Sequence, residues 1–505
     1  MADAVLALDI GTTTIKAALV SRTGTIIALE RAPTPSSSPQ LGWLEHDPQL
    51  LWAASSSVLR RVAAAAAEAG VAPAALAVTG ARGTVCLIDQ DGEALTPFLT
   101  WQDRRCIDVL AALRERLGSE LAFQRQTGVR LDPSLMGPKL VWFREHSPAQ
   151  FDRARWAATT QGFAVMRLSG APPSTDVSTA NFFGLMDIAD AEWSAELIER
   201  FDLPARLLPP LARPGASVGA LAVHVARELG LPTGVPVILA GSDGVCGELG
   251  AGAVEPGQVY GYLGTAAAVA TPILEPRVDP HARLLVSPGS MQGRWRVLGL
   301  GFAGASAADW WRTVAGMDEP AKLDAALAAT APGARGVLFM PTLSGAGTPY
   351  WAARARGAFL GLSLSHSAAE LGRAVCEGIA VEFRMMIDAL RAFGVAPSEL
   401  RLTGGGARSD RWAQLLASVL ALSVARIDHP EPGLLGNACY ALTSIGAFAD
   451  PVAAATALAA PAQIFEPDPA LAGVYGELAA TYDLARTSFE QSGLDERLAS
   501  LGAEA

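Results

Sequence analysis

The hydrophobic pattern near the amino terminus predicts three short strands in succession. Apolar runs cover Val5–Asp9, Ile15–Val20 and Ile26–Arg31. Turn-forming residues separate these runs: a Gly-Thr-Thr-Thr sequence precedes the second, and Thr23-Gly24 precedes the third. We therefore expect a β-meander at the beginning of the fold.

Helical and strand patterns alternate after this meander. The Ala- and Leu-rich stretch Leu50–Ala69 predicts a helix, and the apolar segments Leu76–Val78 and Val85–Ile88 predict two strands after it. A further apolar strand is expected at Val235–Ala240. Such alternation is typical of α/β folds.

A strand, a turn and a strand recur in the second half of the chain. Gly257–Tyr262 and Ala268–Thr271 predict strands on either side of a second Gly-Thr turn. Because this pattern stands at the head of each half, it suggests an internal duplication. Two similar lobes would then face each other across a cleft. The helices expected in the second half are Ser306–Val314, Ala368–Phe393 and Asp410–Leu420.

We place a domain junction near Ala253, shortly after the strand predicted at Val235–Ala240. The predicted domains are residues 1–252, residues 253–455 and a carboxy-terminal helical tail of residues 456–505.

Composition and charge narrow the class of protein. Half of the 505 residues are hydrophobic and 18% are charged, which indicates a folded globular chain with a deep core. The net charge of −11 disfavours attraction to nucleic acid or an anionic membrane, so we expect neither as a partner. The five cysteines are scattered without a CxxC pair, and neither a disulfide framework nor a zinc site is expected. The chain begins without a basic signal region, and we expect a cytoplasmic protein.

The first Gly-Thr turn is a candidate phosphate site. Glycine lets the backbone approach a ligand closely, so the N–H groups around Gly11 and the hydroxyls of Thr12 and Thr13 can bind phosphate oxygens. Lys16 lies just beyond the turn, and Asp9 stands at the end of the preceding strand, where its carboxylate can hold Mg²⁺ directly or through water. The alternative for the turn alone is an ordinary hairpin.

Two glycine-containing segments of the second half are further candidate ligand sites. Gly264-Thr265 would form a second phosphate clamp, and Gly404-Gly405-Gly406-Ala407, between a predicted strand and helix, would let a flat ring lie against the backbone. A flexible connector is the alternative for the triple glycine. No G-x-x-x-x-G-K-[ST] sequence occurs, which excludes a P-loop.

Two other motif matches are discounted. Gly299–Gly304 fits the dinucleotide fingerprint G-x-G-x-x-G, but the strand predicted before it, Trp295–Leu298, is polar on one side and lacks a surrounding βαβ unit. Gly215–Gly219 fits the hydrolase elbow G-x-S-x-G, but it follows a proline-rich stretch instead of a buried strand. We expect neither a dehydrogenase nor a serine hydrolase.

Four polar and aromatic residues are candidates for catalysis and substrate binding. Asp243 follows an apolar strand and can accept a proton from a hydroxyl that attacks phosphorus; the alternative is a helix cap. Trp101 offers an aromatic face beside Asp103, as recognition of a polyol requires, and the alternative for Asp103 is again a cap. Arg82 follows a predicted strand and can reach the same cleft; the alternative is a solvated arginine on a loop.

Taken together, these segments resemble the FGGY family of carbohydrate kinases from Ala7 to about Phe448. ALDIGTTTIKAALV and YLGTAA are similar to the two phosphate motifs of the family, TWQDRR to its substrate segment, GSDG to its catalytic aspartate segment and LTGGGARSDRWAQLLASVL to its adenosine motif. Thr348–Arg384 resembles its long second-lobe signature. The family has a duplicated ribonuclease-H-like lobe, also found in actin and hexokinase. The resemblance thus implies an α/β fold with two such lobes and a cleft between them.

The resemblance also implies an ATP-dependent kinase that uses Mg²⁺. Asp243 would be the general base, and Asp9 would help to place the metal ion. The residues implied to bind the nucleotide are Gly11, Thr12, Thr13, Lys16, Gly264, Thr265, Gly304, Gly404, Gly405, Gly406, Ala407 and Asn437. Those implied to line the sugar pocket are Arg82, Trp101, Asp103 and Asp243.

Within the family the middle of the chain resembles xylulokinases most, which makes D-xylulose the expected substrate. Arg82-Gly83 departs from the Met-His of xylulokinases and from the Arg-acid pair of glycerol kinases. Gly345–Gly347 also replaces the usual Gly-Glu-Arg. Gluconate, glycerol, erythritol and ribulose therefore stay as alternative substrates. A non-enzymatic nucleotide switch like actin or a heat-shock chaperone is the alternative from another class, and a homodimer stays open.

Overall fold

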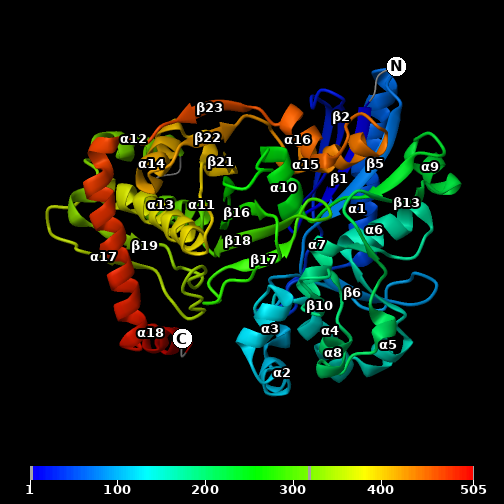
Figure 1. Ribbon diagram of the computed structural model, residues 1–505, viewed down its shortest axis with the longest axis horizontal. Coiled ribbons are helices and arrows are strands. Elements are labelled where there is room, and N and C mark those ends of the chain that lie inside the picture. Colours follow the sequence, from blue (N-terminus) through cyan, green and yellow to red (C-terminus); the bar gives the residue numbers. More distant parts are fainter. Residues whose placement is uncertain (1–3, 317–319, 504–505) are drawn as a thin grey trace. The chain divides into compact units, whose positions relative to one another are not determined.

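The structure is a computed structural model that describes residues 4–316 and 320–503. The chain forms two compact units, and Figure 1 labels their elements. Unit 1 consists of Met1–Val254, Ile273–Arg296 and His429–Ala459, and unit 2 consists of Glu255–Pro272, Val297–Asp428 and Ala460–Ala505. The predicted domains were continuous in sequence, whereas neither unit is: segments 273–296 and 429–459 both belong to unit 1.

The amino-terminal meander forms half of the main sheet of unit 1. Strand β1 (Ala4–Ile10) pairs antiparallel with β2 (Thr14–Ser21), which pairs antiparallel with β3 (Ile26–Pro33), so the predicted β-meander is confirmed. On its other side β1 pairs in parallel with β5 (Pro73–Gly80), and β5 pairs in parallel with β14 (Pro236–Leu239). The carboxyl ends of β1, β5 and β14 therefore lie at the same edge of the sheet.

Strand β13 (Ala216–Ala220) completes this sheet, whose order is β13-β14-β5-β1-β2-β3. The G-x-S-x-G match at Gly215–Gly219 runs into this antiparallel edge strand. It therefore cannot form the strand-to-helix turn of a hydrolase elbow.

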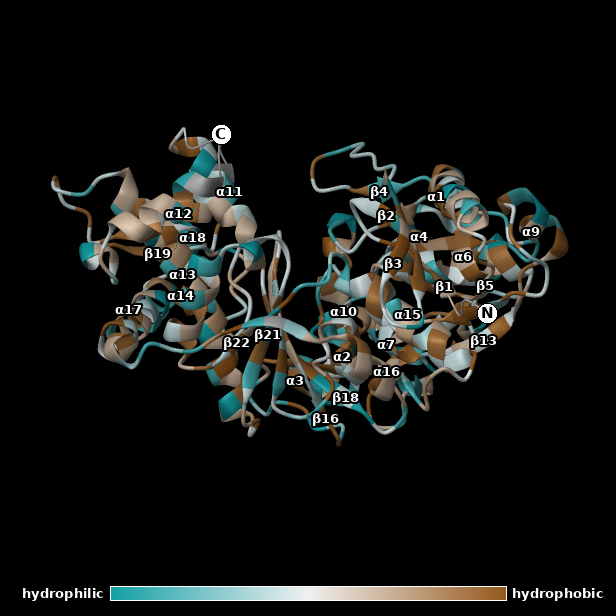
Figure 2. Cartoon of the chain, turned by 90° about the horizontal axis from the view of Figure 1, so that it is seen from above, coloured by the Kyte–Doolittle hydropathy of each residue, from teal (hydrophilic) through white to brown (hydrophobic). Residues whose placement is uncertain are grey.

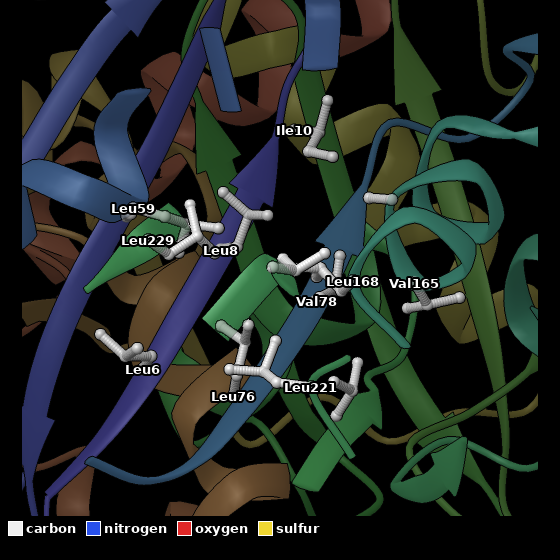
Figure 3. Packing of buried hydrophobic residues seen from close by; sticks show 14 of the residues in the cluster. Leu6, Leu8, Ile10, Leu59, Leu76, Val78, Val165, Leu168, Leu221 and Leu229 are labelled. Carbon is white, nitrogen blue, oxygen red and sulfur yellow. The ribbon is translucent and has the colours of Figure 1, made fainter. Parts of the chain in front are cut away.

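Helices cover one face of the sheet. Helix α1 (Pro48–Glu68) begins where Asp47 accepts hydrogen bonds from two backbone N–H groups of its first turn, slightly earlier than predicted. Figure 3 shows Leu8 of β1 and Val78 of β5 among the packed side chains, with Leu59 of α1 and residues of α6 (Thr160–Ser169). Figure 2 shows hydrophobic residues gathered on these strands. Burial of this apolar face holds the parallel strands together.

The other face is covered by two helices that are distant in sequence. Helix α10 (Asp243–Ala251) follows β14, and α15 (Pro432–Ser444) comes from the segment that returns to unit 1. They approach so closely that a Cβ atom at Gly250 would collide with the carbonyl of Pro432, and one at Gly436 would collide with that of Cys246. Glycine is required at both positions by this close contact.

Shorter elements complete unit 1. A four-stranded sheet runs in the order β4 (Glu45–His46), β7 (Phe98–Leu99), β6 (Val85–Ile88) and β8 (Trp156–Thr159). The other elements are α2 (Leu110–Leu117), α3 (Glu120–Thr127), α4 (Met136–His146), α5 (Pro148–Arg153), β9 (Thr175–Asp176), α7 (Val177–Ala180), β10 (Met186–Asp187), β11 (Glu192–Trp193), α8 (Ala195–Arg200), β12 (Leu211–Ala212), α9 (Val223–Leu229), β17 (Leu285–Pro288) and α16 (Pro451–Leu458).

Unit 2 repeats the strand pattern of unit 1. Strand β15 (Gln258–Leu263) pairs antiparallel with β16 (Ala267–Ile273) and in parallel with β21 (Glu399–Thr403), which pairs in parallel with β22 (Val424–Ile427). A hairpin followed by parallel strands is thus present in both units, as the predicted duplication requires. The sheet continues as β18-β16-β15-β21-β22-β23, where β18 is Trp295–Gly301 and β23 is Pro461–Phe465.

The helices of unit 2 pack around this sheet. The predicted helices are present as α11 (Ala305–Val314), α13 (Ala368–Ala392) and α14 (Asp410–Leu420). The other elements are α12 (Pro320–Ala329), β19 (Leu338–Met340), β20 (Ala358–Leu360), α17 (Ala472–Gln491) and α18 (Leu494–Ala503).

Strand β18 is longer than the sequence indicated, and its residues Arg296, Val297 and Leu298 are all buried. The dinucleotide fingerprint fails for another reason: Gly299 and Gly301 lie inside the strand instead of in a turn after it.

Burial of Glu382 predicts that unit 2 loses stability as the pH rises. Burial raises the pKa of this α13 residue from 4.5 to about 8, against the opposing effect of a hydrogen bond from Tyr482. From about pH 5 to about pH 8 the folded chain retains a proton that the unfolded chain releases. Glu382→Gln should therefore raise Tm at pH 8 and change it little at pH 5, as measured by thermal denaturation.

The matched control is Glu68→Gln, at an exposed glutamate near the end of α1. Its stability should follow the wild-type pH dependence. An unchanged pH dependence in Glu382→Gln would contradict the assignment.

Candidate functional site

Three charged residues converge at the carboxyl edge of the unit 1 sheet. Asp9 stands near the end of β1, Arg82 follows β5, and Asp243 follows β14 as the first residue of α10. The Nε atom of Arg82 lies 3.6 Å from Oδ1 of Asp243. The edge of a parallel sheet thus brings together residues that are far apart in sequence, which is where α/β folds commonly bind ligands.

The Asp243 carboxylate is exposed at the start of a helix. Ser242 occupies the cap position, so the alternative of a capping role for Asp243 is wrong. Oδ1 of Asp243 accepts a hydrogen bond of 2.8 Å from the N–H of Gly244, and 47% of the side chain is accessible. A ligand can therefore reach the Asp243 carboxylate.

Buried hydrogen bonds fix the loop that carries Asp243. Asp176 caps α7 and accepts a hydrogen bond from the hydroxyl of Ser178, whose oxygen in turn accepts one of 2.9 Å from the N–H of Ser242. On the other side, the hydroxyl of Thr79 donates to the carbonyl of Gly241 over 2.7 Å. The sequence gives no sign that Ser178 reaches Ser242.

Asp9 presents an oxygen without a protein partner. Its Oδ1 atom is buried and makes no hydrogen bond. Burial raises its pKa to about 7; Lys16 opposes this shift, while Asp243 and Glu431 add to it. In the described part of the chain, no group of three or more His, Cys, Asp or Glu side chains could hold a metal ion. A hard cation at Asp9 would therefore need oxygen ligands from a substrate or from water.

The first Gly-Thr turn is tied to its surroundings by polar contacts. The carbonyl of Gly11 accepts a hydrogen bond of 2.7 Å from the hydroxyl of Thr34, whose N–H donates to the carbonyl of Thr13 over 3.0 Å. The hydroxyl of Thr12 accepts a hydrogen bond of 3.0 Å from Nε1 of Trp101. This last contact links a predicted phosphate residue directly to a predicted sugar residue.

Lys16 is paired within unit 1. Its ammonium lies 2.7 Å from Glu431, which also pairs with Arg31 at 2.7 Å. The sequence did not indicate this partner, because Glu431 belongs to the segment that returns to unit 1 near the end of the chain. Binding of phosphate by Lys16 stays a prediction.

Asp103 is buried and satisfied by the protein. Its carboxylate accepts hydrogen bonds from the N–H of Leu44 at 2.7 Å and from the guanidinium of Arg105 at 2.8 and 2.9 Å. Arg105 also stacks over the ring of Trp43. These bonds fix the segment that carries Trp101, and a direct contact between Asp103 and a sugar stays a prediction.

Arg296 and Glu248 form part of the site but were missed from the sequence. Arg296, on β18, forms a buried ion pair with Glu248, on α10. Burial raises the pKa of Glu248 to about 7 although Arg296 and Arg82 oppose this shift. The guanidinium of Arg296 packs so tightly on Gly244 that a Cβ atom there would lie 2.8 Å from Nη1. Neither residue belongs to a recognisable motif, so only the fold reveals the pair.

Arg82 is held beside these residues. Its guanidinium lies 4.3 Å from the centre of the Phe182 ring. Burial and the positive charge of Arg296 lower its pKa to about 10, while Asp243 and Glu248 favour its charged form. Gly83 follows with φ of +73°, and a Cβ atom there would lie 2.6 Å from the carbonyl oxygen of Ser134. Glycine is therefore required after Arg82 by the backbone.

The glycines predicted to bind a nucleotide in unit 2 meet around the hairpin between β15 and β16. The N–H of Gly304 donates to the carbonyl of Thr265 over 2.9 Å. Gly404 has φ of +96°, and a Cβ atom there would collide with the carbonyl of Leu263. At Gly405 a Cβ atom would meet nothing within 4 Å. The structure thus brings Gly264, Thr265, Gly304 and the triple glycine to one place in unit 2.

A cavity of about 750 Å³ opens directly after the triple glycine. Its lining includes Ser409 and Arg411 at the start of α14 and Tyr475 on α17. The hydroxyl of Ser409 donates to Asp324 over 2.6 Å, which ties the start of α14 to α12.

Asn437 lies in unit 1, on α15, whereas the triple glycine belongs to unit 2. Its buried side chain donates to the carbonyls of Leu8 at 2.8 Å and Ala77 at 3.3 Å, and its Oδ1 atom has no hydrogen-bond partner. Asn437 therefore joins α15 to β1 and β5. Its contact with a nucleotide stays a prediction.

None of the helices in residues 4–316 and 320–503 has both the length and the apolar character needed to cross a membrane.

Comparison with known proteins identifies the family. Residues 4–250 match the N-terminal domain, and residues 259–445 the C-terminal domain, of the FGGY family of carbohydrate kinases. The chain is 32% identical to a glycerol kinase of Ectopseudomonas mendocina, over 89% of this chain and 92% of the relative. It is 30% identical to the xylulose kinase of Escherichia coli, over 86% and 87% of the two chains.

A solved structure agrees with this assignment. The xylulose kinase of Rhodospirillum rubrum superimposes with a TM-score of 0.89 at 31% identity, covering 97% of this chain and 99% of the other. The similarity therefore covers both units and is not confined to an isolated motif. The chain belongs to the FGGY family of carbohydrate kinases.

Proposed function

We propose that this kinase transfers the γ-phosphoryl group of ATP to a hydroxyl of a small ketose or polyol, with Asp243 as the general base. The observation that carries the proposal is the exposed Asp243 carboxylate at the carboxyl edge of the sheet, with Arg82 at 3.6 Å. A carboxylate in this position can take the proton of an attacking hydroxyl. Phosphoryl transfer otherwise depends on alignment of the two reactants and on neutralisation of the charge on the phosphates.

Backbone groups would hold most of the nucleotide. The N–H groups and hydroxyls of Gly11, Thr12 and Thr13 in unit 1, and the hairpin at Gly264-Thr265 in unit 2, are suited to bind phosphate oxygens. The exposed Gly405 leaves room for a flat base, and the cavity after the triple glycine supports this role. Lys16 would add positive charge near the phosphates.

Asp9 is the residue suited to hold Mg²⁺. Its buried, unpartnered Oδ1 atom is the kind of ligand that this ion prefers, and the remaining ligands would be water and phosphate oxygens. Bound there, Mg²⁺ would neutralise charge that develops on the phosphates.

Trp101 and Arg82 would orient the acceptor. The ring of Trp101 is half-buried and held by Thr12, so that one face is suited to stack on the C–H groups of a sugar. D-Xylulose is the acceptor that the sequence predicted, and glycerol kinases are as similar to this chain as xylulose kinases are. Formation of ADP with a panel of ketoses, polyols and sugar acids tests the proposal, and no ADP with any acceptor would contradict it.

Removal of the proposed base should abolish turnover. Asp243→Asn keeps the shape and the hydrogen bond from Gly244 but cannot accept a proton, so kcat should fall at least about 100-fold. Binding of ATP, measured by titration calorimetry, should persist because the phosphate-binding groups are unchanged. Near-normal kcat would overturn the assignment of Asp243.

Loss of Arg82 should act on the acceptor and not on ATP. Arg82→Ala removes a charged donor beside Asp243, and KM for the acceptor should rise about tenfold or more. KM for ATP should change little in the same steady-state assay. An equal effect on both constants would remove Arg82 from the acceptor site.

A side chain at Gly404 should weaken nucleotide binding. Gly404→Ala is strained at φ of +96° and collides with the carbonyl of Leu263, so the affinity for ATP should fall by about tenfold. The matched control is Gly473→Ala, where a Cβ atom would meet nothing within 4 Å. Equal affinities in the two variants would contradict a role of the triple glycine.

A further inference from the structure

Two buried guanidinium groups at the site have N–H groups without partners. Nη1 of Arg82, and both Nε and Nη1 of Arg296, are buried and make no hydrogen bond within the described chain. Arg296 is 3% accessible. An unpaired charged donor is costly to bury, so these atoms indicate a ligand that completes the site.

The ligand that these donors require is a hydrogen-bond acceptor with more than one oxygen. Glu248 pairs with Arg296, and Asp243 lies near Nε of Arg82. Asp176 is a further acidic group that favours the charged form of Arg82. None of these carboxylates accepts a hydrogen bond from Nη1 of Arg82 or from Nε and Nη1 of Arg296. A ligand group that offers two oxygens can satisfy donors on both guanidinium groups.

We propose that Arg82 and Arg296 together bind a carboxylate of the acceptor, which makes open-chain sugar acids the preferred substrate class. This inference rests on the proposed kinase function. Guanidinium groups match carboxylates in shape and charge, and such hydrogen bonds are about twice as strong as neutral ones. A neutral hydroxyl would satisfy fewer of the free donors.

The same geometry leaves N–H donors, which Asp243 does not use, for an acceptor carboxylate. Arg82 faces Asp243 through Nε, which leaves Nη1 for another oxygen. Arg296 packs against Gly244, on the residue next to Asp243. In an open-chain aldonate the carboxylate and the terminal hydroxyl stand at opposite ends. The acid end would therefore lie on the arginines while a hydroxyl reaches Asp243.

Acceptors that differ in one group test the proposal. D-Gluconate and D-glucitol differ only at C1, which is a carboxylate in the first and a hydroxymethyl group in the second, and D-xylonate and xylitol form a second such pair. In each pair kcat/KM should be at least about tenfold higher for the acid. Equal values, or a preference for the neutral acceptor, would overturn the inference while the kinase function stands.

Variants of Arg296 test whether this residue causes the preference for the acid over the neutral acceptor. Arg296→Gln should lower kcat/KM for the acid about tenfold more than kcat/KM for the neutral acceptor, so that the ratio of the two falls. Because this variant leaves Glu248 buried without its partner, the double variant Arg296→Gln/Glu248→Gln is measured beside it and should show the same loss. Binding of D-gluconate without nucleotide, by calorimetry, should weaken in parallel.

The matched control is the buried pair of Arg486 on α17 and Asp495 on α18. Nε and Nη1 of Arg486 have no hydrogen-bond partner among the described residues, as in Arg296, but Arg486 does not line the cavity after the triple glycine. Arg486→Gln should lower Tm but leave the ratio of acid to neutral kcat/KM unchanged. A changed ratio in Arg486→Gln, or an unchanged ratio in both Arg296 variants, would overturn the role of Arg296. If no acceptor of either kind yields ADP, the proposed kinase function itself fails.

Discussion

Unit 1 must keep several charged side chains together, largely out of water, at the carboxyl ends of three parallel strands. Asp9, Arg82 and Asp243 reach this edge from β1, β5 and β14, and Arg296 and Glu248 lie beside them. Burial disfavours the charged form of each side chain, so each charge depends on neighbouring groups for its stabilisation. The raised pKa of Asp9 and the lowered pKa of Arg82 express this dependence.

The rest of unit 1 holds this edge in place. Thr79 and Ser178 fix the two sides of the loop before Asp243, and Gln161 donates to the carbonyls of both Val78 and Ala240 at 2.9 Å. From the opposite face of the sheet, the side chain of Asn437 donates hydrogen bonds to carbonyls of both β1 and β5. These side chains join neighbouring strands near their ends, where the sheet alone would leave the backbone free. Catalysis by alignment depends on such rigid support.

Local sequence patterns predicted several strands and helices of both units and placed Asp9, Arg82 and Asp243 at or after the ends of predicted strands. The alternation of apolar runs and turns gave the β-meander and its repeat around Gly264-Thr265, and parallel strands explain why Asp9, Arg82 and Asp243 meet. The resemblance to the FGGY family supplied the roles of these residues.

Contacts between distant segments could not be predicted. Arg296 and Glu248 have no motif, and their pairing depends on the return of a later segment to unit 1. For the same reason the partner of Lys16, Glu431, and the carbonyl partners of Asn437 were missed. Asp103 differs from these residues because the sequence contained a recognisable motif around it. Its hydrogen bonds with Leu44 and Arg105 nevertheless could not be predicted.

A crystal structure with a non-hydrolysable ATP analogue and an acceptor that the enzyme phosphorylates tests the central claim most directly. The account predicts a hydroxyl of that acceptor within about 3.2 Å of the Asp243 carboxylate, on the side open to solvent in the present structure. An acceptor bound with all its hydroxyls remote from Asp243 would contradict it.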